Sequence, residues 1–224
     1  MMAKIPIESI LFIDVETVPI APDYQTLDDN LKSHWDKKAS FLTKNDEDDP
    51  SSVFERAGIY AEFGKIVCIS AGRVQNDEIK TKSYYSHNEK QLLEEFTNDL
   101  NIFTRNIPNL YLCAHNGKEF DFPFIIRRMI INQIPVPYIL NTRNKSRYEL
   151  PFLDTMEMWK FGDYKHFTSL ALLCELFGIP TPKNDIDGSQ VASVYYKENN
   201  LERIKEYCEK DVCALIEVYK RLDF

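Results

Sequence analysis

The sequence is poor in three features: long apolar runs, basic residues and paired cysteine motifs. No apolar run approaches the roughly 20 residues of a membrane-spanning helix, so no membrane association is expected. The first residues lack the apolar centre and the small-residue cleavage site of a signal peptide. Five scattered cysteines without a Cys-x-x-Cys pair indicate reduced core residues, not disulfides or zinc ligands. These absences predict a cytoplasmic protein.

Acidic residues outnumber basic ones by 35 to 27, which gives a formal net charge of -8. Such a balance argues against a protein that coats nucleic acid through a generally positive surface. The negative net charge does not exclude an enzyme that holds one end of a nucleic-acid strand. There, a few local cations and bound metal ions would face the phosphates.

The order of apolar patterns predicts one mixed α/β domain over residues 1–224, with a central sheet of five to six strands and helices on both faces. Strands are expected at residues 10–13, 65–71, 78–85, 109–114 and 152–156. Helices are expected at residues 92–103, 120–131, 169–177 and 201–222, and from residue 188 onward. Residues 18–64 form a helical insertion with apolar periodicity at 25–42 and 53–60, and with an acidic run at 45–49 that predicts a solvated loop.

Two carboxylates directly follow the first apolar segment. Ile10–Ile13 is typical of a strand buried on both faces, and Asp14 and Glu16 come at its expected end. Because side chains alternate along a strand, both carboxylates leave on the same face. They repel each other there, so a divalent metal ion between them is the simplest source of positive charge. The alternative is a strand that ends at the surface with two solvated acids.

Two further acids are candidates for the same site. Asp121 begins the predicted helix 120–131, where the alternative is a helix N-cap. Asp211 lies four residues after Tyr207, on one face of the last helix, where the alternative is a surface acid. Four carboxylates suit a pair of hard divalent cations that promote phosphodiester hydrolysis. The ordinary pKa of a tyrosine, near 10, favours Tyr207 as a residue that orients the attacking water, not as a base.

Three ordered motifs make the sequence resemble the DEDD superfamily of 3′–5′ exonucleases. They are Asp14-Val-Glu16-Thr17, Asn116-Gly-Lys-Glu-Phe120-Asp121 and Tyr207-Cys-Glu-Lys-Asp211. The third motif marks the tyrosine subclass. The nearest likeness is to stand-alone predicted exonucleases related to the proofreading domain of family B DNA polymerases, and two further stretches support it, 64–70 and 187–191. The resemblance implies the ribonuclease H-like fold.

The resemblance also implies residue roles. Asp14 would bridge two Mg²⁺ or Mn²⁺ ions, Glu16 and Asp211 would bind the ion on the nucleophile side, and Asp121 would reach the other. Thr17, Asn116 and Phe120 would hold the terminal nucleotides, with Phe120 as a stacking surface.

These observations predict a metal-dependent 3′–5′ exonuclease that acts on single-stranded 3′ ends and prefers DNA. The alternatives are a 3′–5′ exoribonuclease and a catalytically idle nucleic-acid-binding or adaptor domain. A role in DNA repair beside a polymerase or repair partner is expected, but the sequence does not name that partner.

Several polar residues stay without a firm role. Asp154 ends a predicted strand and is unassigned, while His115 and His166 are interpreted as structural or substrate-adjacent because neither has a second histidine at ligand spacing. The remaining basic residues either line a strand-binding groove or are separately solvated, namely Arg127, Arg128, Arg143, Lys145, Arg147, Lys160 and Lys165.

Overall fold

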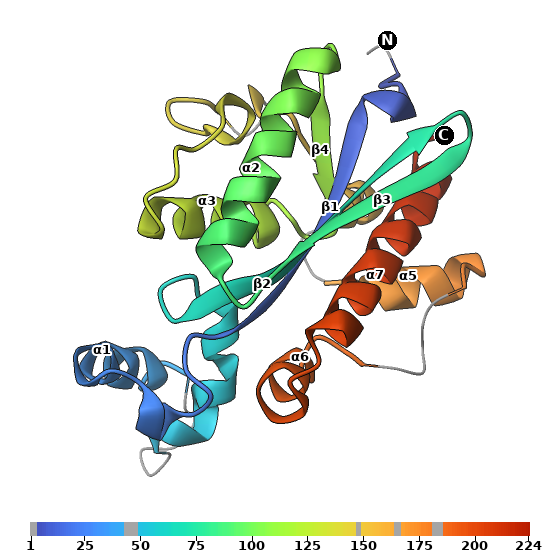
Figure 1. Ribbon diagram of the computed structural model, residues 1–224. Coiled ribbons are helices and arrows are strands. Elements are labelled where there is room, and N and C mark those ends of the chain that lie inside the picture. Colours follow the sequence, from blue (N-terminus) through green and yellow to red (C-terminus); the bar gives the residue numbers. More distant parts are fainter. Residues whose placement is uncertain (1–3, 43–48, 147–148, 164–166, 181–185) are drawn as a thin grey trace.

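A five-stranded sheet in the order β3-β2-β1-β4-β5 runs through the centre of the protein (Figure 1). The computed structural model describes residues 4–42, 49–146, 149–163, 167–180 and 186–224. The strands are β1 (Ile10–Pro19), β2 (Gly64–Gln75), β3 (Glu78–Tyr85), β4 (Tyr111–Ala114) and β5 (Phe152–Asp154). β2 is antiparallel to both β1 and β3, whereas β4 is parallel to both β1 and β5, so the predicted mixed sheet is confirmed.

Helices cover both faces of this sheet. The α-helices are α1 (Asp29–Ala39), α2 (Glu89–Asn106), α3 (Asp121–Ile131), α4 (Thr155–Lys160), α5 (Leu170–Phe177), α6 (Val191–Ser193) and α7 (Leu201–Leu222). Short 3-10 helices span Ile7–Ser9, Tyr24–Thr26, Pro50–Ile59 and Tyr138–Leu140, and a π-helical turn spans Val194–Glu198. Among the described helices, none is both long and apolar enough to cross a membrane.

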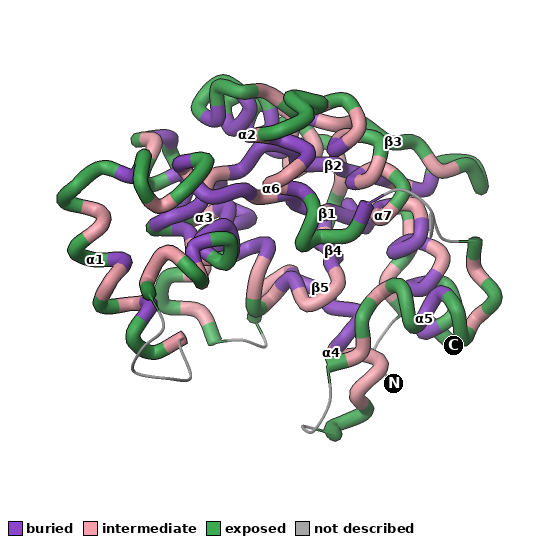
Figure 2. Tube along the Cα trace, turned by 90° about the horizontal axis from the view of Figure 1, so that it is seen from below, coloured by how far each residue is buried: buried purple, intermediate pink, exposed green. Residues whose placement is uncertain are grey.

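The two faces of β1 bury different residues, as the alternation of a strand requires. Leu11, Ile13 and Val15 pack in a core with α2 and α3. Ile10 and Phe12 pack in a second core with α7. Figure 2 shows β1, β2 and β4 mostly buried between these layers. Since Asp14 and Glu16 continue the second row, both carboxylates lie on the face that α7 covers.

β1 is longer than the sequence suggested. It does not end before Asp14, because β2 continues to pair with it as far as Pro19 opposite Gly64. On its other side, β4 pairs only with Ile10–Phe12. The acids therefore lie inside a strand at the point where one of its two neighbours stops. The expectation of a strand end was wrong, since the pairing with β2 depends on residues about 50 positions away.

The insertion 18–64 has a small core of its own. The predicted helix 25–42 is shorter than expected, because Asp28 accepts a hydrogen bond from the Asn30 N–H and begins α1 there. The buried residues of the insertion's core are Ala21, Leu27, Trp35, Ala39, Phe54, Ala57 and Phe63. The 3-10 helix Pro50–Ile59 packs tightly on β1: a Cβ on Gly58 would lie 3.2 Å from Pro19. Residues 45–48 of the predicted acidic loop lie outside the described residues.

Candidate active site

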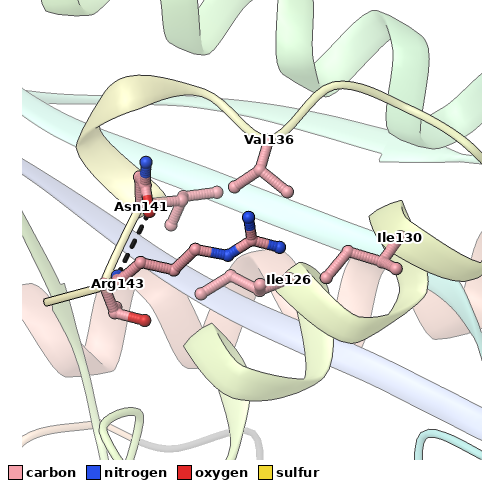
Figure 3. A pocket seen from close by; sticks show the side chains of 7 residues that line it. Ile126, Ile130, Val136, Asn141 and Arg143 are labelled. Carbon is pink, nitrogen blue, oxygen red and sulfur yellow. Dashed lines mark hydrogen bonds between the residues drawn. The ribbon is translucent and has the colours of Figure 1, made fainter.

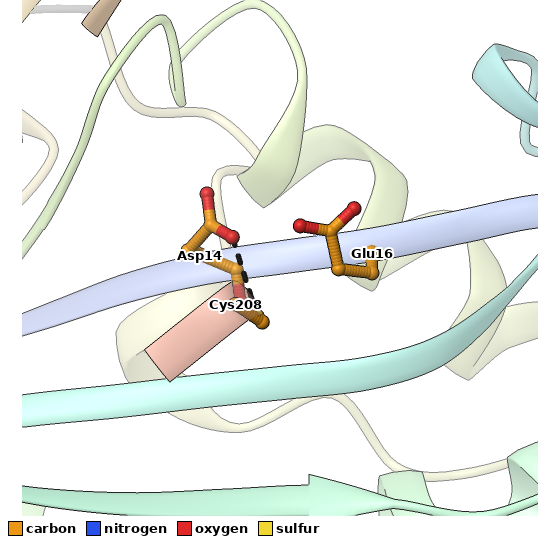
Figure 4. A group of neighbouring side chains, drawn as sticks. All are labelled: Asp14, Glu16 and Cys208. Carbon is orange, nitrogen blue, oxygen red and sulfur yellow. Dashed lines mark hydrogen bonds between the residues drawn. The ribbon is translucent and has the colours of Figure 1, made fainter. Parts of the chain in front are cut away.

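Three elements bring the four predicted acids together. Asp14 and Glu16 project from β1, Asp121 is the first residue of α3, and Asp211 is on α7. Figure 4 shows the carboxylates of Asp14 and Glu16 on the same side of β1, beside Cys208 of α7. One ligand atom from each of these three residues lies within 4.8 Å of the others. Asp121 and Asp211 are outside that tightest group.

A cleft of about 550 Å³ opens over these acids. Seven of the eight predicted site residues line it: Asp14, Glu16, Thr17, Phe120, Asp121, Tyr207 and Asp211. Their individual roles stay predictions. Asn116, the eighth, does not line the cleft, and its φ of 62° makes it a turn residue after β4.

The insertion forms one wall of this cleft, which the sequence did not reveal. Glu55, Arg56 and Ile59 of its 3-10 helix line the cleft, together with Ser189 and Ala192. Among the described lining residues, Arg56 is the one with a permanent positive charge. No local signal marks Arg56, because it reaches the site only through the packing of the insertion on β1.

Burial makes the acids weak. Burial raises the pKa of Asp14 to about 6, and burial together with the nearby Asp14 charge raises the pKa of Asp211 to about 7. Burial also raises the pKa of Glu16 and of Asp121 well above the usual range, and the Asp14 charge raises both further. Among the described residues, no lysine or arginine forms an ion pair with any of the four. The cluster therefore lacks the positive charge that its ionised form needs.

Tyr207 cannot serve as a base at neutral pH. Burial and the neighbouring Asp211 raise the pKa of its hydroxyl, which also hydrogen-bonds to Asp211. The hydroxyl therefore stays protonated and can donate a hydrogen bond. Its single hydrogen goes to the Asp211 carboxylate, so the orientation of a water molecule by Tyr207 stays a prediction.

Asp154 has a clear structural role that the sequence left open. This buried acid accepts hydrogen bonds from the backbone N–H groups of Asn116 (2.9 Å), Lys118 (3.1 Å) and Met156 (3.0 Å). It thereby caps α4 and pins the loop that leads from β4 to Asp121. Gly117 completes that loop, since a Cβ there would lie 2.2 Å from Ala114 Cβ.

His115 lines the cleft, but both of its ring nitrogens have protein partners. Nε2 lies 2.7 Å from the Thr168 carbonyl and Nδ1 lies 2.9 Å from the Thr155 hydroxyl. Because a carbonyl only accepts, Nε2 carries a hydrogen and donates it. Burial lowers the pKa of the ring. His115 is therefore a neutral structural residue, not a metal ligand.

The predicted groove of basic residues stays a prediction, and one of its residues is misassigned. Arg128 is buried and forms an ion pair with Glu89 (2.6 Å), so its expected place in a groove was wrong. Arg143 points into a separate pocket of about 260 Å³ beside Ile126 and Ile130 of α3 (Figure 3). Arg147, Lys165 and His166 lie outside the described residues.

Comparison with known proteins places the chain in a family. No curated protein matched the sequence. The structure of the family B DNA polymerase from the hyperthermophilic archaeon Pyrobaculum calidifontis is similar, with a TM-score of 0.59 and 12% sequence identity. The match covers 95% of this chain but 24% of the polymerase chain, and it shows the ribonuclease H-like fold. The model of a family described as "predicted 3′-5′ exonuclease related to the exonuclease domain of PolB" matches residues 59–224. The chain belongs to this exonuclease family.

Proposed function

We propose that the protein removes nucleotides from single-stranded 3′ ends, with DNA preferred over RNA, and that it uses two divalent metal ions, Mg²⁺ or Mn²⁺. The observation that carries the proposal is the convergence of four acids in one cleft, Glu16 and Asp121 buried and Asp14 and Asp211 half-buried, without a basic partner among the described residues.

The ligand atoms suit these ions. All four acids offer carboxylate oxygens, which are the hard ligands that Mg²⁺ and Mn²⁺ prefer. Asp14, Glu16, Asp121 and Asp211 would hold the ions, which would activate a water molecule and stabilise the leaving oxygen. Tyr207 would orient that water through its protonated hydroxyl.

The cleft suits the end of a single strand. Its volume of about 550 Å³ is that of a pocket for one small ligand and is too small for a duplex. Thr17 lies beside the acids, and Phe120 offers a ring on which a base can stack. Arg56, which also lines the cleft, would face a phosphate of the bound strand.

The same proposal places the protein in the cytoplasm and in DNA repair, beside a polymerase or repair partner. All five cysteines are unpaired, which supports a reducing compartment.

The direct test compares oligonucleotides labelled at the 3′ or the 5′ end, with matched single-stranded DNA, duplex DNA and RNA. Mg²⁺, Mn²⁺ or EDTA is added to each. We expect a 5′-labelled DNA strand to shorten stepwise and a 3′ label to be released as a mononucleotide, in the presence of metal only. Glu16→Gln should abolish cleavage, whereas Asp77→Asn, a change in the exposed β2–β3 turn, should not affect it.

Each outcome is decisive. Faster cleavage of RNA would make the protein an exoribonuclease. Binding of the oligonucleotides by a folded protein that leaves them intact would favour an adaptor role and would refute the exonuclease proposal.

A further inference from the structure

A chain of small polar side chains crosses the sheet beneath α7 and reaches Asp14. In the strand register, Asp14 faces Ser70 of β2, Ser70 faces Ser83 of β3, and Glu16 faces Cys68. All of these side chains lie on the α7 face, because cross-strand partners share a face. A polar band within an otherwise apolar core requires hydrogen-bond partners.

Those partners form one connected series. Ser83 Oγ lies 2.8 Å from Glu209 Oε1, Ser70 Oγ lies 2.7 Å from Ser83 Oγ, and Cys68 Sγ lies 3.8 Å from Ser70 Oγ. The carboxylate of Glu209 accepts, so Ser83 donates to it. Ser70 must then donate to Ser83, and Cys68 to Ser70, because each group has a single hydrogen.

Cys208 is the remaining donor. It is fully buried on α7 and adjoins Cys68, whose own hydrogen is already engaged. Its Sγ lies 3.2 Å from Asp14 Oδ2 and 3.4 Å from the Asp14 carbonyl oxygen. An ionised carboxylate is a far better acceptor than the sulfur of Cys68, so the Cys208 hydrogen goes to Asp14.

We propose that Cys208 is a positioning residue of the active site, which holds Asp14 Oδ2 through its thiol hydrogen and leaves the other oxygen for metal binding. Figure 4 shows one Asp14 oxygen facing the Cys208 sulfur while the other points away from it. The inference rests on the proposed function in one respect: Asp14 is taken as a metal ligand. Residues that orient a ligand in this way commonly change metal affinity by about 10- to 100-fold.

The test uses three variants at position 208 and one control. Cys208→Ala removes the donor, Cys208→Val removes it while filling the space of the sulfur, and Cys208→Ser restores a donor. Cys113→Ala is the matched control, because Cys113 is a second fully buried thiol that has no hydrogen-bond partner among the described residues. Mn²⁺ binding to each protein is measured by calorimetry, and cleavage of a labelled strand is followed over a series of Mn²⁺ concentrations.

We expect Cys208→Ala and Cys208→Val to raise the Mn²⁺ dissociation constant about tenfold or more, and to shift the Mn²⁺ dependence of cleavage by the same factor. Cys208→Ser should stay within about threefold of wild type, and Cys113→Ala should leave metal binding unchanged although it removes a core sulfur. If the Cys208 thiol were purely structural, both alanine variants would have a lower unfolding midpoint, but their Mn²⁺ affinities would not differ.

Unchanged Mn²⁺ affinity in folded Cys208→Val would overturn the inference, and so would a failure of serine to restore it. A wild-type protein that binds no Mn²⁺ would overturn the inference and the proposed function together. If Mn²⁺ affinity depends on Cys208 but no nucleic acid is cleaved, only the proposed function fails.

Discussion

Replacing Asp14 by asparagine should stabilise the metal-free protein at neutral pH. Burial raises the pKa of Asp14 from 3.8 to about 6. Ionising this carboxylate in the folded state is therefore harder than in the unfolded chain. A difference of about two units between the pKa in the folded protein and in the unfolded chain corresponds to about 3 kcal/mol in the free energy of unfolding.

The sign follows from which state holds the proton. Below about pH 4 the carboxyl group is protonated in both states and has no effect on stability. Between about pH 4 and pH 6 the unfolded chain ionises first, so the folded protein loses stability as the pH rises. Above about pH 6 the full penalty applies. The amide in Asp14→Asn never ionises and can still accept a hydrogen bond from Cys208, so the variant avoids this loss.

Urea unfolding in EDTA at about pH 4 and about pH 8 measures the effect, with Asp77→Asn as the control for loss of an exposed acid. We expect Asp14→Asn to match wild type at the lower pH and to exceed it by about 3 kcal/mol at the higher. Added Mn²⁺ should reverse the order, because only wild type gains from binding the ion. An equal gain at both pH values, or none at the higher pH, would refute the reasoning.

Three further substitutions test other parts of the site. A Cβ on Gly72 would lie 2.4 Å from Val212 Cγ1, so Gly72→Ala should displace α7, lower stability by about 1–3 kcal/mol in urea unfolding and slow cleavage. Asp154→Ala leaves three backbone N–H groups unpaired and should lower stability by about 3 kcal/mol or more, with cleavage lost through displacement of Asp121; Asp154→Asn should be milder. Tyr207→Phe should slow cleavage by about 100-fold in single-turnover assays while calorimetry shows unchanged Mn²⁺ affinity. Loss of metal binding in that variant would contradict the assigned role.

The sequence predicted the order of strands and helices because each carries its own local pattern. Asn88 illustrates such a local pattern: it accepts a hydrogen bond from the Gln91 N–H, three residues on, and caps α2. The four acids were also found in this way, since short motifs contain them. Such features depend only on residues that are close together in the sequence.

Features that depend on distant partners were missed or misassigned. Asp154 looked like another acid at a strand end, but its partners at Asn116 and Lys118 lie 38 and 36 residues away. Arg127 and Arg128 were grouped together, although their adjacent places on α3 give them different surroundings. Only Arg128 reaches the buried Glu89 at the start of α2. Adjacent residues on a helix point in directions about 100° apart, so one of the two was bound to face another way.

The shortness of β4 explains why the site exists at this place in the sheet. β2 pairs with β1 from Phe12 to Pro19, with a register shift after Glu16, so Asp14 and Glu16 lie in extended, paired backbone. The pairing of β4 with β1 ends at Phe12, and after Ala114 the chain turns away through Asn116 at positive φ, fixed by Asp154. A longer β4 would cover this side of β1 beside the acids and close the cleft. The loop that Asp154 pins therefore does two things at once: it leaves β1 open to substrate, and it brings Asp121 to the gap. Asp154 is buried and does not line the cleft, yet for this reason its replacement should affect cleavage as much as stability.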